Sequence, residues 1–543
     1  MDTKVLQFDS LLRGRLLILA GLALVWLVLA VFLVPIAIEA AYNKQLPIGF
    51  LNDLIRNQQG NPVSHYTDMW FWRMLPFTLF GFAMVAACLI WMSGDAFYRR
   101  FVHGHTATHL AILRIAVCSI LAINAAWEDL ASSALIPIEF QRNMGVIELL
   151  EWVPGFVPLT QSPSALAAWQ IATCLLLVLG ALGLFTRWTL PLAAIGALVM
   201  GGILRQYSHL FHTMLLPMWM LFFLCFYRCA DRLSLDRKIG WVHRSSPASA
   251  AHYAWGFYLC MIVMAVTYMS TGTSKIINGG ADWFLGGTLK TYVLLDALGN
   301  QQFSNDLAAS LLQTPEWIFD VLAFVAMYGE LFYILVLFFA WARIVFPLLM
   351  LGLHLSIFLL MNILFFDLIA LQLVVFIGPA LWRRFAAPSG ASDQSAAGAS
   401  KSPLVAAVML PLLVCVALGR FEFYPFSAWQ MYAQPAQHGK VPIHRVWAVR
   451  ASGLREEAPL WQAIPALHDG RYMDRFYMAH SESGEAVYRQ FLDTCAEILN
   501  AGSDDPINTL IVESRRWDHR LQPFEGEASG EVIGRLVHHV DRD

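Results

Sequence analysis

The sequence predicts an all-α polytopic membrane bundle of about eleven transmembrane helices, with a small C-terminal α+β domain outside the membrane. Hydrophobic residues make up 58% of the chain and charged residues only 14%. Several apolar stretches reach the roughly 20 residues that an α-helix needs to cross a bilayer. Because these stretches are apolar throughout rather than at alternate positions, they indicate helices and not the strands of a membrane barrel.

The predicted spans are largely apolar stretches separated by more polar segments. In chain order they are residues 16–38, 74–92, 110–127, 165–185, 190–204, 212–226, 253–271, 318–340, 345–363, 364–381 and 404–418. The first is too long for the core of a signal peptide and lacks a small-residue cleavage pattern, so we expect a retained helix. Residues 362–367 allow only a tight turn between the ninth and tenth spans.

Basic residues gather in every second loop and predict the orientation. They are Lys4, Arg13, Arg15, Arg99, Arg100, Arg187, Arg228, Arg232, Arg237, Lys238, Arg244, Arg343, Arg383, Arg384 and Lys401. With an odd number of spans these residues all fall on one side, which the positive-inside rule assigns to the cytoplasm. We therefore expect a cytoplasmic N-terminus and an extracytoplasmic C-terminal domain, as in a protein of a bacterial inner membrane.

Composition divides the chain into five parts. They are a two-helix membrane extension (1–105), a transmembrane core (106–385), a low-complexity cytoplasmic linker (386–402), a last transmembrane helix (403–419) and a small extracytoplasmic α+β domain (420–543). The linker is rich in Ala, Ser and Gly, which is typical of a flexible segment. In the last part, residues 441–450, 510–512 and 532–540 favour strands, and residues 483–499 carry apolar side chains at helical spacing.

Charge and motifs exclude several functions. A net charge of −3 gives no reason to expect nucleic acid as a partner. Of the eight cysteines only Cys495 lies in the polar tail, so no disulfide framework is expected there. The nucleophile elbow, the Walker loop, the dinucleotide fingerprint and the Cys-x-x-Cys pair do not occur in the sequence.

Lys275 is the first candidate for chemistry. It follows the apolar stretch 253–272 by three residues and precedes Asp282 and Trp283. Desolvation at the edge of the hydrocarbon disfavours the ammonium form and favours a neutral amine that can act as a base. The structural alternative is an interfacial lysine whose head group reaches water beside an anchoring tryptophan.

Two more charged residues lie inside predicted spans. Arg114 requires a carboxylate such as Glu128 or Glu330, a lipid head group or a bound anion. Glu330 is central in its span, so it is either paired or protonated. Exposure of either charge to lipid would cost about 2.5–3.5 kcal/mol, so we expect both side chains to face the interior of the bundle.

Histidines and aromatic residues supply the remaining candidates. His209 and His212 are three residues apart and share a face if the segment is helical. Together with His354 they suggest a metal set, but no matching second pair accompanies them, and no metal site is predicted. Trp429 belongs to an aromatic cluster after the last span, where both interfacial anchoring and ligand binding are open.

Several motifs agree in order and approximate spacing with the vitamin K-dependent gamma-carboxylase superfamily, whose membrane core is called the horizontally transferred transmembrane (HTTM) domain. The stretches that resemble it are 110–114 with Arg114, 180–187, His212-Thr-Met-Leu (less well His209), Ser234-Leu-Asp236, 271–275 with Lys275, Ala281-Asp-Trp283, His354 with Met361-Asn362, and 424–431 with Trp429. The resemblance covers residues 106–439. It departs from the family by a two-residue insertion between Lys275 and Trp283, by the first two spans and by a shorter tail.

The resemblance implies a membrane enzyme that couples oxygenation of a quinol to carboxylation of a peptide glutamate. Lys275 would deprotonate a reduced vitamin K or menaquinol-type quinol, with O2 and CO2 as further reactants. His212, or His209, would stabilise the quinol oxygen or the departing charge. The candidate residues for substrate or cofactor binding are Arg114, Trp283, Glu330, His354, Asn362 and Trp429. Membrane lipids and a peptide or small protein substrate are the expected partners.

Two other functions stay open at this point. One is a non-enzymatic HTTM-type membrane protein that serves maturation, export or immunity for a toxin or peptide. The other is a transporter, for which only the number of spans argues. Lys275 and His212 favour the enzyme, whereas the short tail favours a reduced or different substrate.

Overall fold

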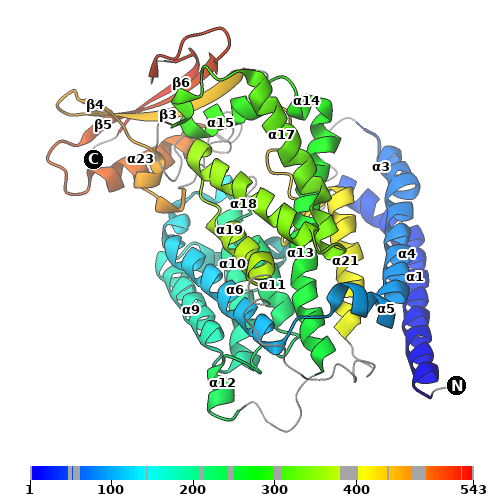
Figure 1. The fold of residues 1–543 in the computed structure, drawn as a ribbon. Coiled ribbons are helices and arrows are strands. Elements are labelled where there is room, and N and C mark those ends of the chain that lie inside the picture. Colours follow the sequence, from blue (N-terminus) through cyan, green and yellow to red (C-terminus); the bar gives the residue numbers. More distant parts are fainter. Residues whose placement is uncertain are drawn as a thin grey trace.

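The computed structural model of this chain describes residues 3–46, 52, 61–141, 145–207, 212–241, 249–298, 307–379, 402–436, 439–467, 485–526 and 529–540. This part of the chain is mostly helical and ends in a small sheet (Figure 1). His209 and nearly all of the predicted linker 386–402 lie outside the described residues.

Every predicted span coincides with an apolar helix. Eight helices among the described residues are long and apolar enough to cross a membrane: α1 (Thr3–Tyr42), Val63–Met92 with α3 (Val63–Met69) and α4 (Leu75–Met92), α6 (Ala107–Trp127), α9 (Pro163–Leu182), α10 (Thr186–Arg205), α13 (Ala250–Gly279), Glu316–Leu337 with α17 (Glu316–Leu331), and α18 (Ala342–Met361). The other three are shorter: α11 (Leu215–Leu224), Phe366–Ile377 with α19, and α21 (Ser402–Gly419). The ten residues of α11 rise only about 15 Å, half of a hydrocarbon core.

The central helix of the bundle is α13, which is apolar on all sides and nearly completely buried. It packs against α6, α11, α17 and α21. In contrast, only small fractions of the strongly apolar helices α1 and α9 are buried: 6% of the most apolar window of α1 and 22% of that of α9. A water-soluble protein does not leave apolar surfaces of this extent uncovered.

The N-terminal extension joins the core through the last apolar helix. Trp26 of α1 donates a hydrogen bond to Thr78 of α4 (2.9 Å), and Trp70 donates to the carbonyl of Ala30 (2.9 Å). The helix α4 in turn packs against α21, which also lies along α13 (Figure 1). The predicted parts 1–105 and 403–419 are therefore in contact in the folded chain.

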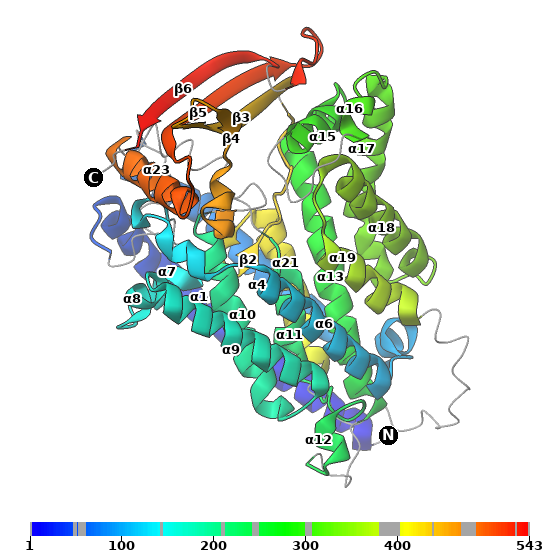
Figure 2. The same ribbon diagram turned by 90° about the vertical axis from the view of Figure 1, so that its left-hand side faces the viewer.

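The C-terminal part contains a four-stranded antiparallel sheet in the order β4-β3-β5-β6. Its strands are β3 (Lys440–Arg450), β4 (Arg455–Glu457), β5 (Ile507–Asp518) and β6 (Glu531–His539), and α23 (Glu485–Asn500) accompanies it. The three strands and the helix predicted from the sequence are confirmed, whereas β4 is an additional strand. The strand β3 packs against α15 (Thr288–Leu298), which fixes the sheet at one end of the bundle (Figure 2).

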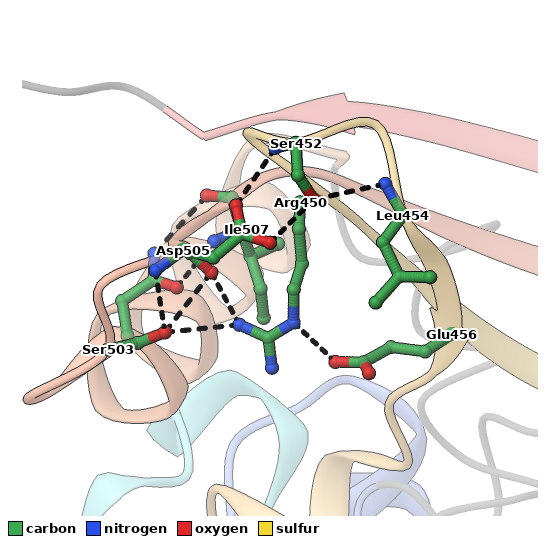
Figure 3. A network of polar contacts seen from close by, with 8 residues as sticks. Arg450, Ser452, Leu454, Glu456, Ser503, Asp505 and Ile507 are labelled. Carbon is green, nitrogen blue, oxygen red and sulfur yellow. Dashed lines mark hydrogen bonds and ion pairs between the residues drawn. The ribbon is translucent and has the colours of Figure 1, made fainter.

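A polar network fastens two turns of this domain together (Figure 3). The Arg450 guanidinium pairs with Glu456 (2.6 Å) and donates to the carbonyl of Asp505 (2.6 Å). Ser452 donates to the Asp505 carboxylate from its backbone (2.8 Å) and from its hydroxyl (2.6 Å). These hydrogen bonds lower the pKa of the Asp505 carboxyl. The turn before β4 is thereby held to the turn before β5.

The described basic loops lie at the end of the bundle opposite the sheet. Arg237 and Lys238 belong to α12 (Leu235–Lys238), which lies at that end together with the N-terminus (Figures 1 and 2). Arg343 donates to the carbonyl of Phe101 (2.8 Å), immediately after Arg99 and Arg100. The described basic loops, which the sequence placed on one side, therefore lie at one end of the folded chain.

Candidate functional site

Lys275 and Glu330 form a buried ion pair between α13 and α17. Lys275 Nζ lies 2.5 Å from Glu330 Oε2, and each residue is only 5% exposed. The ring of Trp283 lies 4.9 Å from the same ammonium. The structure thus brings together three of the residues that the sequence singled out, and the interior position expected for Glu330 is confirmed.

Local backbone geometry explains how Trp283 reaches Lys275. The helix α13 ends at Gly279, and Gly280 adopts a φ of +54°, a conformation that glycine takes up without strain. The chain then turns into the short helix α14 (Ala281–Phe284). Because of this reversal the indole ring lies back over the end of α13, and its Nε1 donates to the carbonyl of Tyr432 (2.7 Å).

The close approach of α13 and α17 depends on Gly272. A Cβ atom at this position would lie 2.4 Å from the backbone nitrogen of Leu331 and 2.8 Å from the carbonyl oxygen of Met327. Only glycine permits the two backbones to come this close. Since Lys275 and Glu330 flank this contact along their own helices, it sets the distance that their side chains must bridge.

Two proton arrangements are chemically open to this pair. One is an ammonium with a carboxylate, and the other is a neutral amine with a carboxylic acid. Burial penalises an isolated charge in either residue, so each depends on the other. A proton that moves along the 2.5 Å hydrogen bond interconverts the two forms, and the neutral form offers an amine that can accept a proton.

Residues 422–434, which we call the strap, cross the same end of α13. The carbonyl of Ala428 accepts hydrogen bonds from Ser270 (2.6 Å) and Ser274 (3.2 Å), and the carbonyl of Gln434 accepts one from Tyr292 (2.5 Å). Together with the bond from Trp283 to Tyr432, these contacts hold the strap on α13, α14 and α15. The segment that the sequence placed after the last span is therefore part of the core.

His212 contacts the strap at Ser427 and Trp429. The His212 Nε2 lies 2.9 Å from Ser427 Oγ, and its ring stacks on Trp429 with centroids 4.7 Å apart. Ser427 donates to Glu422 (3.1 Å), which pairs with Arg205 (3.0 Å). Ala428, whose carbonyl accepts the hydrogen bonds from Ser270 and Ser274 of α13, lies between Ser427 and Trp429 in the chain. This residue of the strap therefore connects His212 to the Lys275 end of α13.

His354 belongs to α18 and contacts α13 farther from the end that carries Lys275. Its Nε2 is 2.8 Å from the hydroxyl of Tyr268, which precedes Lys275 by about two helical turns. Asn362 has a structural position: it ends α18 with a φ of +60°, a left-handed conformation that asparagine tolerates better than most residues. The tight turn predicted at residues 362–367 is confirmed, because α19 begins at Phe366.

Arg114 lies apart from Lys275. It is fully buried, as expected, but its guanidinium donates to the carbonyls of Cys229 (3.0 Å), Ala181 (3.3 Å) and Leu233 (2.5 Å). The predicted pairing with Glu128 or Glu330 is therefore wrong. Ala181 lies at the end of α9, and Cys229 and Leu233 lie in the segment between α11 and α12. Three backbone acceptors converge there on one guanidinium, and no carboxylate is required.

Sequence reasoning missed the polar residues around Tyr268. They are Tyr268 itself, Tyr333, Asp367 and Gln372, all of them buried. A signal was present, because Tyr268 is seven residues from Lys275 and Tyr333 three from Glu330, spacings that share a helix face. Tyrosines in apolar stretches are common, however, and this spacing gains meaning only when α13 and α17 are known to face each other.

Comparison of the chain with protein-family models, with curated proteins and with solved structures found no match. The functional argument therefore depends on the geometry of the site itself.

Proposed function

We propose that this chain is an integral multi-pass membrane enzyme in which Lys275 is the base that activates a lipid-soluble quinol. The apolar surfaces of α1 and α9 would contact lipid, and about eleven spans would place the N-terminus in the cytoplasm and the sheet outside. The single observation that carries the proposal is the buried Lys275–Glu330 pair beneath Trp283.

A pair of this kind is a weak contribution to stability. Two charges must be removed from water, and apolar residues of similar volume often serve folding equally well or better. Ionisable residues among apolar helices are therefore functional candidates by default. An amine with an adjacent carboxylate is suited to accept a proton from a substrate hydroxyl and to pass it on.

The proposed substrate is a quinol of the vitamin K or menaquinone class. Lys275 would take the proton of one quinol hydroxyl, and Trp283 offers an aromatic face beside it. His212, held by Ser427 and Trp429, would be the polar group for the second oxygen. In the full reaction dioxygen is the oxidant: one of its atoms enters the quinone epoxide and the other leaves as water, while CO2 is added to the γ-carbon of a peptide glutamate.

The test uses purified protein with reduced menaquinone, dioxygen, labelled CO2 and a glutamate-containing peptide. We expect quinone epoxide from the wild type and none above background from Lys275→Ala, with partial recovery when a small amine is supplied in solution. The matched control is Lys290→Met. It removes another buried lysine, whose ammonium donates to the carbonyls of Leu312 (2.7 Å) and Thr314 (2.9 Å) and faces the ring of Phe319.

The outcomes separate the alternatives. Epoxide formation without incorporation of label would retain Lys275 as the base and restrict the enzyme to the quinol half-reaction. A non-enzymatic HTTM-type protein would leave the quinol unchanged in every variant. Full epoxide formation by Lys275→Ala would contradict the assignment of the base.

A further inference from the structure

A second buried polar cluster lies next to the Lys275–Glu330 pair. Its centre is Tyr268 of α13, whose hydroxyl is 2.8 Å from His354 Nε2. The ring of Tyr268 stacks on Tyr333 with centroids 4.5 Å apart, and the Tyr333 hydroxyl donates to Gln372 Oε1 (2.5 Å). The four side chains come from α13, α18, the end of Glu316–Leu337 and α19, so tertiary packing assembles the cluster.

Two buried carboxylates flank this cluster along the chain. Glu330 precedes Tyr333 by three residues, and Asp367 follows Phe365 by two residues. The ring centroid of Phe365 lies 5.7 Å from that of His354. Asp367 is also held in place, because its carboxylate accepts hydrogen bonds from the backbone of Leu368 (2.9 Å) and of Met214, two residues after His212. Tyr268 and His354 therefore lie between the ion pair and a second carboxylate.

Two buried nitrogen atoms of the cluster are not engaged in hydrogen bonds with the described residues. No described residue makes a hydrogen bond to His354 Nδ1 or to Gln372 Nε2, although both side chains are at least nine-tenths buried. Leaving such buried atoms unpaired is unfavourable, and most folded proteins avoid it. A histidine with one ring nitrogen engaged and the other open can take a proton at one side and release it at the other.

We propose that Tyr268 and His354 form a proton relay between the Lys275–Glu330 pair and Asp367. This inference rests on the proposed function, because the relay removes the proton that Lys275 takes from the quinol. Lys275 gains this proton while Glu330 still carries the proton of the neutral pair. Glu330 gives its proton to the Tyr268 oxygen, the Tyr268 hydroxyl passes its own proton to His354 Nε2, and the His354 ring releases a proton from Nδ1 to the Asp367 carboxylate. Lys275 then passes its proton to the Glu330 carboxylate, which restores the neutral amine. No electrons move, and the proton taken from the quinol is matched by the one that Asp367 gains.

The first experiment compares Tyr268→Phe with Tyr258→Phe. Both tyrosines are buried on α13, but among the described residues the Tyr258 hydroxyl bonds only to a backbone group, the carbonyl of Leu337 (3.2 Å). The Tyr268→Phe variant keeps the ring that stacks on Tyr333. We expect the first turnover of menaquinol in this variant to proceed as in the wild type, and steady-state turnover to fall about a hundredfold with an increased solvent deuterium isotope effect. Tyr258→Phe should retain the wild-type values.

The second experiment uses His354→Ala with a series of imidazoles of similar size and different basicity. A relay predicts that steady-state turnover recovers and that the recovered rate follows the basicity of the added imidazole. A side chain that only fills space predicts recovery that depends on the size of the compound and not on its basicity.

The outcomes distinguish the relay from the function on which it rests. Wild-type protein that turns over no quinol overturns the proposed function and the relay with it. A quinol-active wild type in which Tyr268→Phe matches Tyr258→Phe overturns the relay alone. Recovery of His354→Ala that is independent of imidazole basicity also overturns it.

Discussion

Substitution of Gly272 by alanine should separate the two helices that carry the ion pair. The new methyl group would lie 2.4 Å from the backbone nitrogen of Leu331, whereas ordinary contact begins at 3.4 Å, so α13 and α17 must move apart by about 1 Å. Overpacking against backbone costs about 1–3 kcal/mol of unfolding free energy. The same movement would take the Lys275–Glu330 distance from 2.5 Å to the limit of hydrogen bonding.

The assay is denaturant unfolding of the purified protein in detergent, followed by tryptophan fluorescence. The matched control is Gly352→Ala on α18, because a Cβ atom there meets no atom within 4 Å. Alanine is favoured over glycine in a helix by roughly 0.5–1 kcal/mol, so this variant should be as stable as the wild type or slightly more stable. Equal stability of the two alanine variants would refute the argument that the backbone contact sets the ion pair.

Three further predictions test other parts of the molecule. Lys275→Met should lower the free energy of unfolding by about 3–5 kcal/mol, because Glu330 stays buried without a partner. Adding Glu330→Leu should recover most of this free energy, and a double variant as unstable as the single one would contradict the prediction. Burial and the nearby Lys290 lower the pKa of His519, so the folded protein should lose stability as the pH drops below about 6.5. Thermal unfolding should show a weaker decline of the melting temperature with falling pH in His519→Gln than in the wild type. A reporter that is active only in the cytoplasm should be silent when fused after Asp543, and strong activity would reverse the orientation.

The sequence by itself located the apolar helices and the main strands. Each apolar stretch became a helix, and residues 441–450 became part of β3, because hydropathy and periodicity are properties of neighbouring residues. The sequence also placed Lys275 near the end of its helix. It could not indicate that three of the apolar helices are short, since an apolar stretch looks the same whether it spans a bilayer or packs inside a protein.

The tertiary structure alone decided which residues meet. The sequence suggested Arg114 as a partner for Glu330, whereas the close approach of the helices at Gly272 brings Lys275 to it. Three main-chain carbonyls satisfied Arg114 instead, which the sequence cannot reveal because every residue carries a carbonyl. Pairing between distant helices depends on which faces pack together, and one sequence without its fold specifies the faces but not their partners.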